Sequence, residues 1–384
     1  MARLQVGIET TCTAPLWVER LGMRMAKLAG ADSMLLPDHY LGFVPTAFWK
    51  PEYTPAAKMV PSTDAFFDPF VMLGMMATRY RGVRIGTGVT EAYRRHPVTL
   101  AQAFVTVDHM TKGRAILGIG NGERVNTEPY GIPFTKRVGR LEEALTIIRL
   151  LWESRGEPVS FAGPTWKLTK ALFTTPLYKD KAPAVWVAAH APRMLGLAGR
   201  FGDGWYPTQK MTPEEYARKL GVIRAAATAA GRSFDRFEPA LQIQVALGAG
   251  RRPVIEGLMK VKPATAMALL LAGAVWKKHG LTHPLGEDFE GFGDILPNEI
   301  PLAAFASAEK QLTPELLGDG LCAGTVDEVV ADVAPLLAAG LKHVVMWNIG
   351  PLASGGSPAD MVRQTQLIWK LKKLQTNDAT RAAA

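Results

Sequence analysis

The chain has 384 residues, of which 48% are hydrophobic and 21% charged, with a formal net charge of +9. This composition is ordinary for a folded enzyme and excludes a disordered chain. The first residues lack a signal-peptide pattern, and the longest apolar run, 264–276, is too short to cross a bilayer, so we expect a cytoplasmic protein. The two cysteines, Cys12 and Cys322, have no metal-ligand spacing, so we expect neither a disulfide framework nor a metal site.

The positive charge is compatible with several partners. Lysine and arginine are scattered and no nucleic-acid-binding motif is visible, so we expect no nucleic-acid partner. A phosphate-bearing cofactor and an anionic membrane surface suit the charge equally well, so a peripheral membrane contact stays open.

Short apolar strands alternate with helices along the chain. The strands are predicted at 3–9, 33–37, 83–89, 115–120, 184–189, 203–206, 239–247 and 343–349. The helices are predicted at 16–29, 68–79, 97–110, 139–154, 193–200, 213–230 and 326–339. Near-continuous apolar strands separated by helices indicate a parallel sheet covered on both faces. We therefore predict an α/β protein, a (β/α)₈ barrel that uses residues 1–384 as one domain.

Four inserts interrupt the predicted barrel, at about 40–67, 121–137, 157–183 and 280–320. The loops after the strands build the active site of such a barrel, and all the inserts except the third follow a strand or lie near the last strands. Their aromatic residues make substrate walls or lids as plausible as plain surface loops. The tail from about residue 375 is expected to be flexible.

Polar and glycine residues gather where six of the predicted strands end. They are Asp38 and His39; Gly88, Val89 and Thr90; Gly120, Asn121, Gly122 and Glu123; Ala189, His190, Ala191, Pro192 and Arg193; Tyr206; and Trp347 with Asn348. Carboxyl ends of parallel strands meet at one rim of a barrel, so we expect these residues to lie together.

His39 and Glu123 are the candidate proton donors. Histidine exchanges a proton near neutral pH, and a carboxylate beside a bound ring can act as an acid or base. The alternatives are a histidine satisfied by local hydrogen bonds and a solvated loop acid.

Two glycine-rich or helix-opening turns could bind a cofactor. The segment LGIGNGE, 117–123, has GxGxG rather than the dinucleotide fingerprint and no apolar helix follows it, so we reject a Rossmann site. The turn 189–193 opens a predicted helix, whose free N–H groups suit a phosphate. An ordinary strand-to-helix turn is the alternative.

These segments resemble the luciferase-like superfamily of flavin and deazaflavin enzymes. The resemblance rests on LLPDHY, on IGTGVTEAYRRHPVTLAQAFVTVDHMTKGRAILGIGNGE and on VWVAAHAPRMLGLAGRFGDGWYP. Within it the chain most resembles the phthiodiolone dimycocerosates ketoreductases, through GERVNTEPYG, KALFTTPLYKDKAPAVWVAAHAPRM and HGLTHPLGEDFEGFGDILP.

The resemblance implies a barrel of the bacterial-luciferase type and coenzyme F420, a 5-deazaflavin, as cofactor. It implies that Asp38 and His39 bind the cofactor, that Glu123 and Asn126 belong to the site, and that the bond between Gly88 and Val89 is cis. The phosphate turn reads AHAP where related sugar-phosphate dehydrogenases have two glycines, and Phe43 replaces their tryptophan. Sugar-phosphate chemistry is therefore not expected.

We expect an oxidoreductase that passes hydride from reduced F420 to a ketone of a long-chain lipid, with Phe43, Tyr206 and Trp347 at the substrate. The alternatives are an FMN-dependent monooxygenase on the same fold and a non-catalytic cofactor-binding protein. A homodimer is also expected. The apolar run 264–276 favours a large apolar substrate, although the core face of one barrel helix explains the run as well.

Overall fold

The computed structural model describes residues 2–208 and 210–376. Within these residues, eight parallel strands close into a barrel, because β10 pairs with both β9 and β12. In chain order, which is also their order around the barrel, they are β2 (Gln5–Glu9), β3 (Ser33–Leu36), β4 (Arg84–Thr87), β5 (Ala115–Ile119), β8 (Ala184–Val187), β9 (Gly204–Trp205), β10 (Glu238–Leu247) and β12 (His343–Asn348). All eight predicted strands are present, and the predicted (β/α)₈ fold is confirmed.

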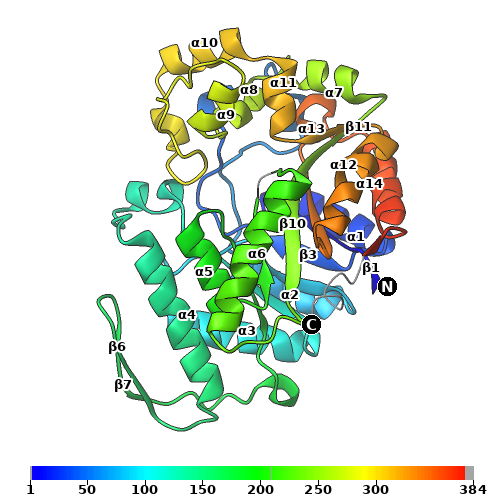
Figure 1. The fold of residues 1–384 in the computed structure, drawn as a ribbon. Helices are drawn as coiled ribbons and strands as arrows, with labels where there is room; N and C mark the ends of the chain where they lie inside the picture. Colours follow the sequence, from blue (N-terminus) through cyan, green and yellow to red (C-terminus); the bar gives the residue numbers. More distant parts are fainter. Residues whose placement is uncertain (1, 209, 377–384) are drawn as a thin grey trace.

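A helix follows each barrel strand and covers the outside of the sheet (Figure 1). These helices are α1 (Leu16–Leu28), α2 (Pro69–Arg79), α3 (Pro97–Thr111), α4 (Arg137–Glu153), α5 (Pro192–Phe201), α6 (Pro213–Ala229), α12 (Val326–Ala338) and α14 (Pro358–Leu371). The first seven match the predicted helices. The eighth, α14, was not predicted, although Ser357 and Asp360 form a capping box at its start.

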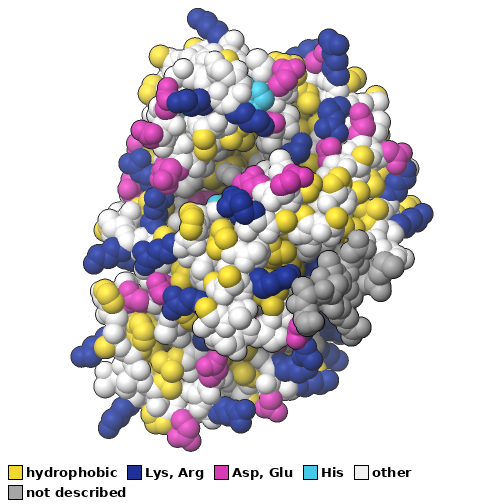
Figure 2. Space-filling model, viewed as in Figure 1, with side chains coloured by type: hydrophobic (Ala, Val, Ile, Leu, Met, Phe, Trp, Pro, Cys, Tyr) yellow, Lys and Arg dark blue, Asp and Glu magenta, His cyan; other side chains and the backbone are white. Residues whose placement is uncertain are grey.

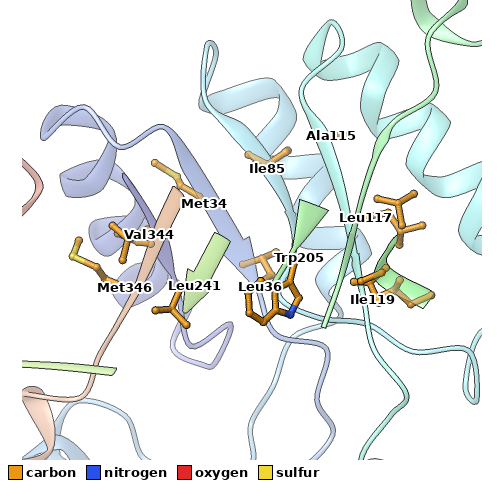
Figure 3. Packing of buried hydrophobic residues seen from close by; sticks show 14 of the residues in the cluster. Met34, Leu36, Ile85, Ala115, Leu117, Ile119, Trp205, Leu241, Val344 and Met346 are labelled. Atoms are coloured by element: carbon orange, nitrogen blue, oxygen red, sulfur yellow. The ribbon is translucent and has the colours of Figure 1, made fainter. Parts of the chain in front are cut away.

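The strands are apolar on both faces because both faces are buried. Alternate side chains point outward to the helices, as Figure 3 shows for Met34 and Leu36 on β3 and for Leu117 and Ile119 on β5. The intervening side chains fill the barrel, namely Leu35, Ile116, Trp186, Tyr206, Ala240 and Val345. Removing these surfaces from water stabilises the barrel that holds the strand ends in place.

Glycine lets β4 and β5 approach closely. A Cβ atom at Gly86 would lie 1.9 Å from the carbonyl oxygen of Ile116, and one at Gly118 would lie 2.0 Å from that of Thr87. Any larger residue would push these two strands apart, so the glycines fix the spacing of the loops that follow them.

The chain between β10 and α12 forms a layer of short helices, which we call the cap. It contains α7 (Arg251–Leu258), α8 (Lys262–Ala268), α9 (Gly273–Lys278), α10 (Leu302–Gln311) and α11 (Pro314–Asp319), and ends in the strand β11 (Cys322–Gly324) beside β10. Figure 1 shows these helices above the barrel. The cap is thus longer than the predicted insert at 280–320.

The apolar run 264–276 is not the core face of one barrel helix. It forms α8 and the start of α9, with Leu269 and Leu270 wholly buried between them, so it packs the interior of the cap. The adjacent Lys277 and Lys278 form ion pairs with Glu287 and Asp319, which leaves less positive charge for an anionic surface. Over residues 2–208 and 210–376, no helix combines the length and hydropathy that crossing a membrane requires.

Three remaining segments complete the described chain. The predicted insert at 157–183 contains an antiparallel hairpin, β6 (Val159–Ala162) with β7 (Lys167–Ala171), which projects from the body in Figure 1. The short helix α13 (Pro351–Ser354) follows β12. The tail that was expected to be flexible begins with β13 (Gln375–Thr376), paired with β1 (Ala2–Arg3); residues 377–384 lie outside the described residues.

Candidate active site

Two of the predicted polar residues meet at the carboxyl ends of the strands. His39 follows β3 and Glu123 follows β5, and the structure brings His39 Nε2 to 3.3 Å from Glu123 Oε2. The histidine side chain is 11% exposed and the glutamate side chain 29%, so the pair is accessible from only one side. Burial raises the pKa of Glu123, while the nearby charges of His39 and Arg94 act in the opposite direction. The pair can therefore hold a proton between Nε2 and Oε2.

Asn126 orients this pair. It lies in the helical turn Arg124–Asn126, where its Oδ1 accepts from the Tyr40 backbone N–H at 2.8 Å and its Nδ2 donates to Glu123 at 3.0 Å. The same Nδ2 lies 3.1 Å from His39 Nδ1, which is also 3.1 Å from the Leu41 carbonyl. Nδ1 can accept from Asn126 or donate to Leu41, so the imidazole has a partner in its neutral and its charged form.

Asp38 anchors the strand end behind His39. Its side chain is buried, and its Oδ2 accepts from Thr90 Oγ1 at 2.6 Å. Arg94 and Arg95 form ion pairs with it at 3.2 and 3.3 Å. Both oxygens of this carboxylate thus have protein partners, which fixes the strand end that carries His39; the predicted contact of Asp38 with a cofactor stays a prediction. The sequence reasoning missed both arginines, although they stand in the motif EAYRRHP.

The backbone between β4 and the site has the geometry that the resemblance implied. The peptide bond between Gly88 and Val89 is cis. Beside it, a Cβ atom at Gly120 would lie 3.1 Å from Val89 Cγ2, and Gly122 has a φ of 78°. The partly buried Asn121 lies between these two glycines. Within the segments 88–90 and 120–122, Val89, Asn121 and Gly122 are partly exposed, whereas Gly88, Thr90 and Gly120 are buried. The glycines leave space beside the partly exposed residues, against which a flat ring can lie.

Glu9, at the end of β2, belongs to the same site and was not predicted. Its Oε2 accepts from Tyr206 Oη at 2.6 Å and from Gln242 Nε2 at 2.9 Å, and a Cβ atom at Gly88 would lie 2.9 Å from it. Burial raises the pKa of Glu9 to about 8 against the effect of these two hydrogen bonds. Its position, a carboxyl group at the end of the first strand, could have indicated a site residue. The sequence analysis used residues 3–9 only to predict a strand.

Tyr206 lies elsewhere than predicted. Its side chain is wholly buried inside the barrel, where it donates to Glu9, so it does not line the mouth as a substrate contact would. We assign it to positioning Glu9.

The turn 189–193 precedes α5, as predicted. Ala189 is buried, whereas Ala191, Pro192 and Arg193 are exposed, and no side chain caps the helix at Ala191. Burial and the charge of Lys219 lower the pKa of His190 to about 4, and its buried Nδ1 has no hydrogen-bond partner among the described residues. The uncapped N–H groups and the exposed Arg193, which also pairs with Glu142 at 3.3 Å, suit a phosphate oxygen.

An apolar wall stands beside His39. The ring of Phe43 lies 4.9 Å from His39 and 5.0 Å from Phe292 of the cap. The same cluster contains Met267, Leu270, Ile295, Leu285, Phe289, Ile300, Trp347 and Leu352. Phe43 and Trp347 both belong to this wall, and their contact with a substrate stays a prediction. The cap supplies most of the other residues of the wall, which was not predicted.

The described residues contain no group of three or more His, Cys, Asp or Glu side chains arranged to hold a metal ion.

Residues 22–343 match the family model of the luciferase-like monooxygenases. The chain belongs to this family. The predicted family is confirmed, and with it the class of oxidoreductases. The chain is 42% identical over 336 residues to a phthiodiolone/phenolphthiodiolone dimycocerosates ketoreductase of Mycobacterium kansasii, with 87% of this chain and 91% of the relative covered.

Solved structures share the fold at lower identity. An F420-dependent secondary alcohol dehydrogenase in complex with an F420–acetone adduct superposes with a TM-score of 0.73 at 20% identity, covering 96% of this chain and 99% of the other. The oxygenating constituent of 3,6-diketocamphane monooxygenase from Pseudomonas putida, in complex with FMN, superposes with a TM-score of 0.65 at 17% identity. The match covers 97% of this chain and 98% of the other. Identities this low bear on the fold alone.

Proposed function

We propose that this protein is an F420-dependent oxidoreductase that reduces a ketone on a long-chain lipid to the secondary alcohol. The observation that carries the proposal is the His39–Glu123 pair, 3.3 Å apart at the barrel mouth beside the apolar wall. The similarity to a lipid ketoreductase over 87% of the chain supports the substrate class.

The site residues fit the deazaflavin. The surface of Gly88, Val89, Gly120, Asn121 and Gly122 leaves room for the ring, and the uncapped start of α5 with Arg193 would hold a phosphate. When bound, the reduced deazaflavin supplies the hydride.

The chain supplies the proton. Hydride addition to a carbonyl carbon leaves negative charge on its oxygen, and a proton from His39 Nε2 or Glu123 Oε2 completes the alcohol. Asn126 holds the side chains of His39 and Glu123 in place relative to each other, and Asp38 fixes the strand end that carries His39. The raised pKa of Glu123 favours the protonated form from which transfer starts.

Glu9 has a separate part. With a pKa of about 8 it is protonated at neutral pH, so it adds no negative charge below the ring surface. Tyr206 and Gln242 keep it against Gly88. We assign Glu9 to positioning the ring surface and setting its electrostatics.

Measurements of binding alone can test the identity of the cofactor. We expect F420 to bind at least tenfold tighter than FMN, about 1.4 kcal/mol, measured by fluorescence titration. Arg193→Gln should weaken F420 binding, since its phosphate would lose a charged partner, whereas Arg218→Gln on the exposed face of α6 should not. Equal affinities for the two cofactors would contradict the proposal.

An FMN-dependent monooxygenase is the second candidate, because an FMN-bound monooxygenase shares the fold over 97% of this chain. Oxygen consumption with reduced FMN and the same ketones separates the two activities. Rapid oxygen consumption without ketone reduction would favour the monooxygenase.

The substrate class predicts a dependence on chain length. The apolar wall includes Phe43, Phe292 and Trp347, so each buried methylene of an acyl chain should add about 0.8 kcal/mol until the wall is covered. We expect kcat/KM to rise over a series of ketones from short to long acyl chains, and Phe292→Ala to flatten the rise. Efficient oxidation of a sugar phosphate, or a flat series, would contradict a lipid substrate.

A further inference from the structure

A cationic cavity lies at the end of the barrel opposite the candidate active site. Its volume is about 610 Å³, and it is lined by the first residues of barrel strands, among them Arg84, Ala115 and Ala184. Seven of its lining residues are lysine or arginine, while its only acidic lining residues are Asp108 and Asp203. The cations are Arg84, Lys112, Arg149, Lys179, Lys181, Arg232 and Arg236.

Three arginines form the inner part of this cavity. Arg84 pairs with Glu238 at 2.6 Å, whereas Arg149 and Arg232 share the single carboxylate of Asp203, at 2.7 and 3.0 Å. Burial and the neighbouring charge of Arg149 lower the pKa of Arg232. Two guanidinium groups on one carboxylate leave an excess of positive charge inside the cavity, which an anion would offset.

Four further cations stand at the rim without a counter-ion. Lys112, Lys179, Lys181 and Arg236 are exposed, and none of them forms an ion pair within residues 2–208 and 210–376. The nearby Asp108 accepts from the Ala115 backbone N–H at 2.9 Å, so its carboxylate is engaged in fixing the start of β5. The rim therefore presents several unpaired cationic donors to one open cavity.

The cavity also offers an aromatic surface. Tyr178 and Phe237 line it between the cations, with Tyr178 half-buried beside Gly113. A volume of about 610 Å³ is the size that sites for small molecules usually have. An anionic group at the rim and a carbon skeleton on Tyr178 would use both kinds of lining residue.

We propose that this cavity is a binding site for a small organic phosphate, separate from the catalytic mouth. Lys112, Lys181 and Arg236 hold the phosphate, and Tyr178 packs against the rest of the molecule. The alternative is that the arginines only stabilise the starts of the barrel strands through their ion pairs, in which case the cavity binds no phosphate.

Pyrophosphate and adenosine diphosphate are suitable probes. Calorimetric titration of the full-length protein at constant ionic strength should show saturable binding of both, with adenosine diphosphate tighter because it also covers Tyr178. The triple variant Lys112→Gln, Lys181→Gln, Arg236→Gln should bind at least tenfold more weakly. It should keep its fold, because these side chains are exposed and unpaired, and a thermal unfolding scan checks this.

Two controls distinguish binding in this cavity from nonspecific electrostatic attraction between the anion and the positively charged protein. Lys50→Gln, Arg218→Gln, Lys310→Gln removes the same charge at exposed positions outside the cavity and should leave binding unchanged. An equal loss in both triple variants, or no saturation, would overturn the proposal. Vesicles of phosphatidylglycerol should not compete; competition by vesicles would assign the charges to a membrane surface instead.

Discussion

Replacing His39 by alanine or Glu123 by glutamine is expected to lower turnover of a ketone substrate by roughly a hundredfold or more. In the proposed reaction the proton comes from His39 Nε2 or Glu123 Oε2, which lie 3.3 Å apart, and either change removes a group that can deliver it. Steady-state rates with saturating cofactor measure the effect. The affinity for the cofactor should be unchanged in Glu123→Gln, because the amide keeps the shape of the side chain and can still face Asn126.

A nearby acid provides the matched control. Glu128 lies five residues further along the same loop and pairs with the exposed Arg124, away from His39. Glu128→Gln should therefore leave turnover within about twofold of the original protein. Near-normal turnover in both His39→Ala and Glu123→Gln would show that the proton comes from elsewhere, and Glu9 would then be the next group to test.

The second large effect concerns stability. Glu9 has a pKa of about 8 in the folded chain, raised from an ordinary value of 4.5. Between these values the folded state keeps a proton that the unfolded chain has lost, so the free energy of unfolding should fall as pH rises from 5 to 9. The Glu9 contribution should be on the order of 2–4 kcal/mol. Glu9→Gln removes the ionisation, so its stability should exceed that of the original protein most at pH 9.

Denaturant unfolding at pH 5, 7 and 9 measures this difference. Glu299→Gln, at an exposed position of the cap, should leave the pH dependence of the original protein unchanged. A parallel pH dependence in the Glu9→Gln variant and the original protein would mean that Glu9 is ionised in the folded state. Turnover of Glu9→Gln should meanwhile lose any pH dependence that centres near 8.

The local sequence was sufficient for the barrel. Strands such as β5 are buried on both faces, so their sequences are unbroken apolar runs. The helices between them have residues that favour a helix start, such as Pro97 at the start of α3. Once the strand ends were known, topology alone brought His39 and Glu123 to one rim. These parts could be predicted because periodicity and strand direction are properties of the chain itself.

The cap and the packing behind the site could not be predicted in this way. The run 264–276 was interpreted as one helix face or as a surface for lipid. Other parts of the cap bury most of it in a small separate core, whereas Met267 and Leu270 belong to the apolar wall beside His39. Tyr206 ends a strand like the other candidates, and only the register inside the barrel turned it toward Glu9.

The sequence by itself determined the strands, the family and the placement of His39 and Glu123 at one rim, because each depends on a local pattern or on the direction of a strand. Only the tertiary structure decided which acids and bases matter to one another. Glu9 meets Gln242 across 233 residues of chain, and Phe43 meets Phe292 of the cap. A pKa of about 8 at Glu9 arises from burial by those distant segments, and burial is a property of the packed molecule rather than of any stretch of sequence.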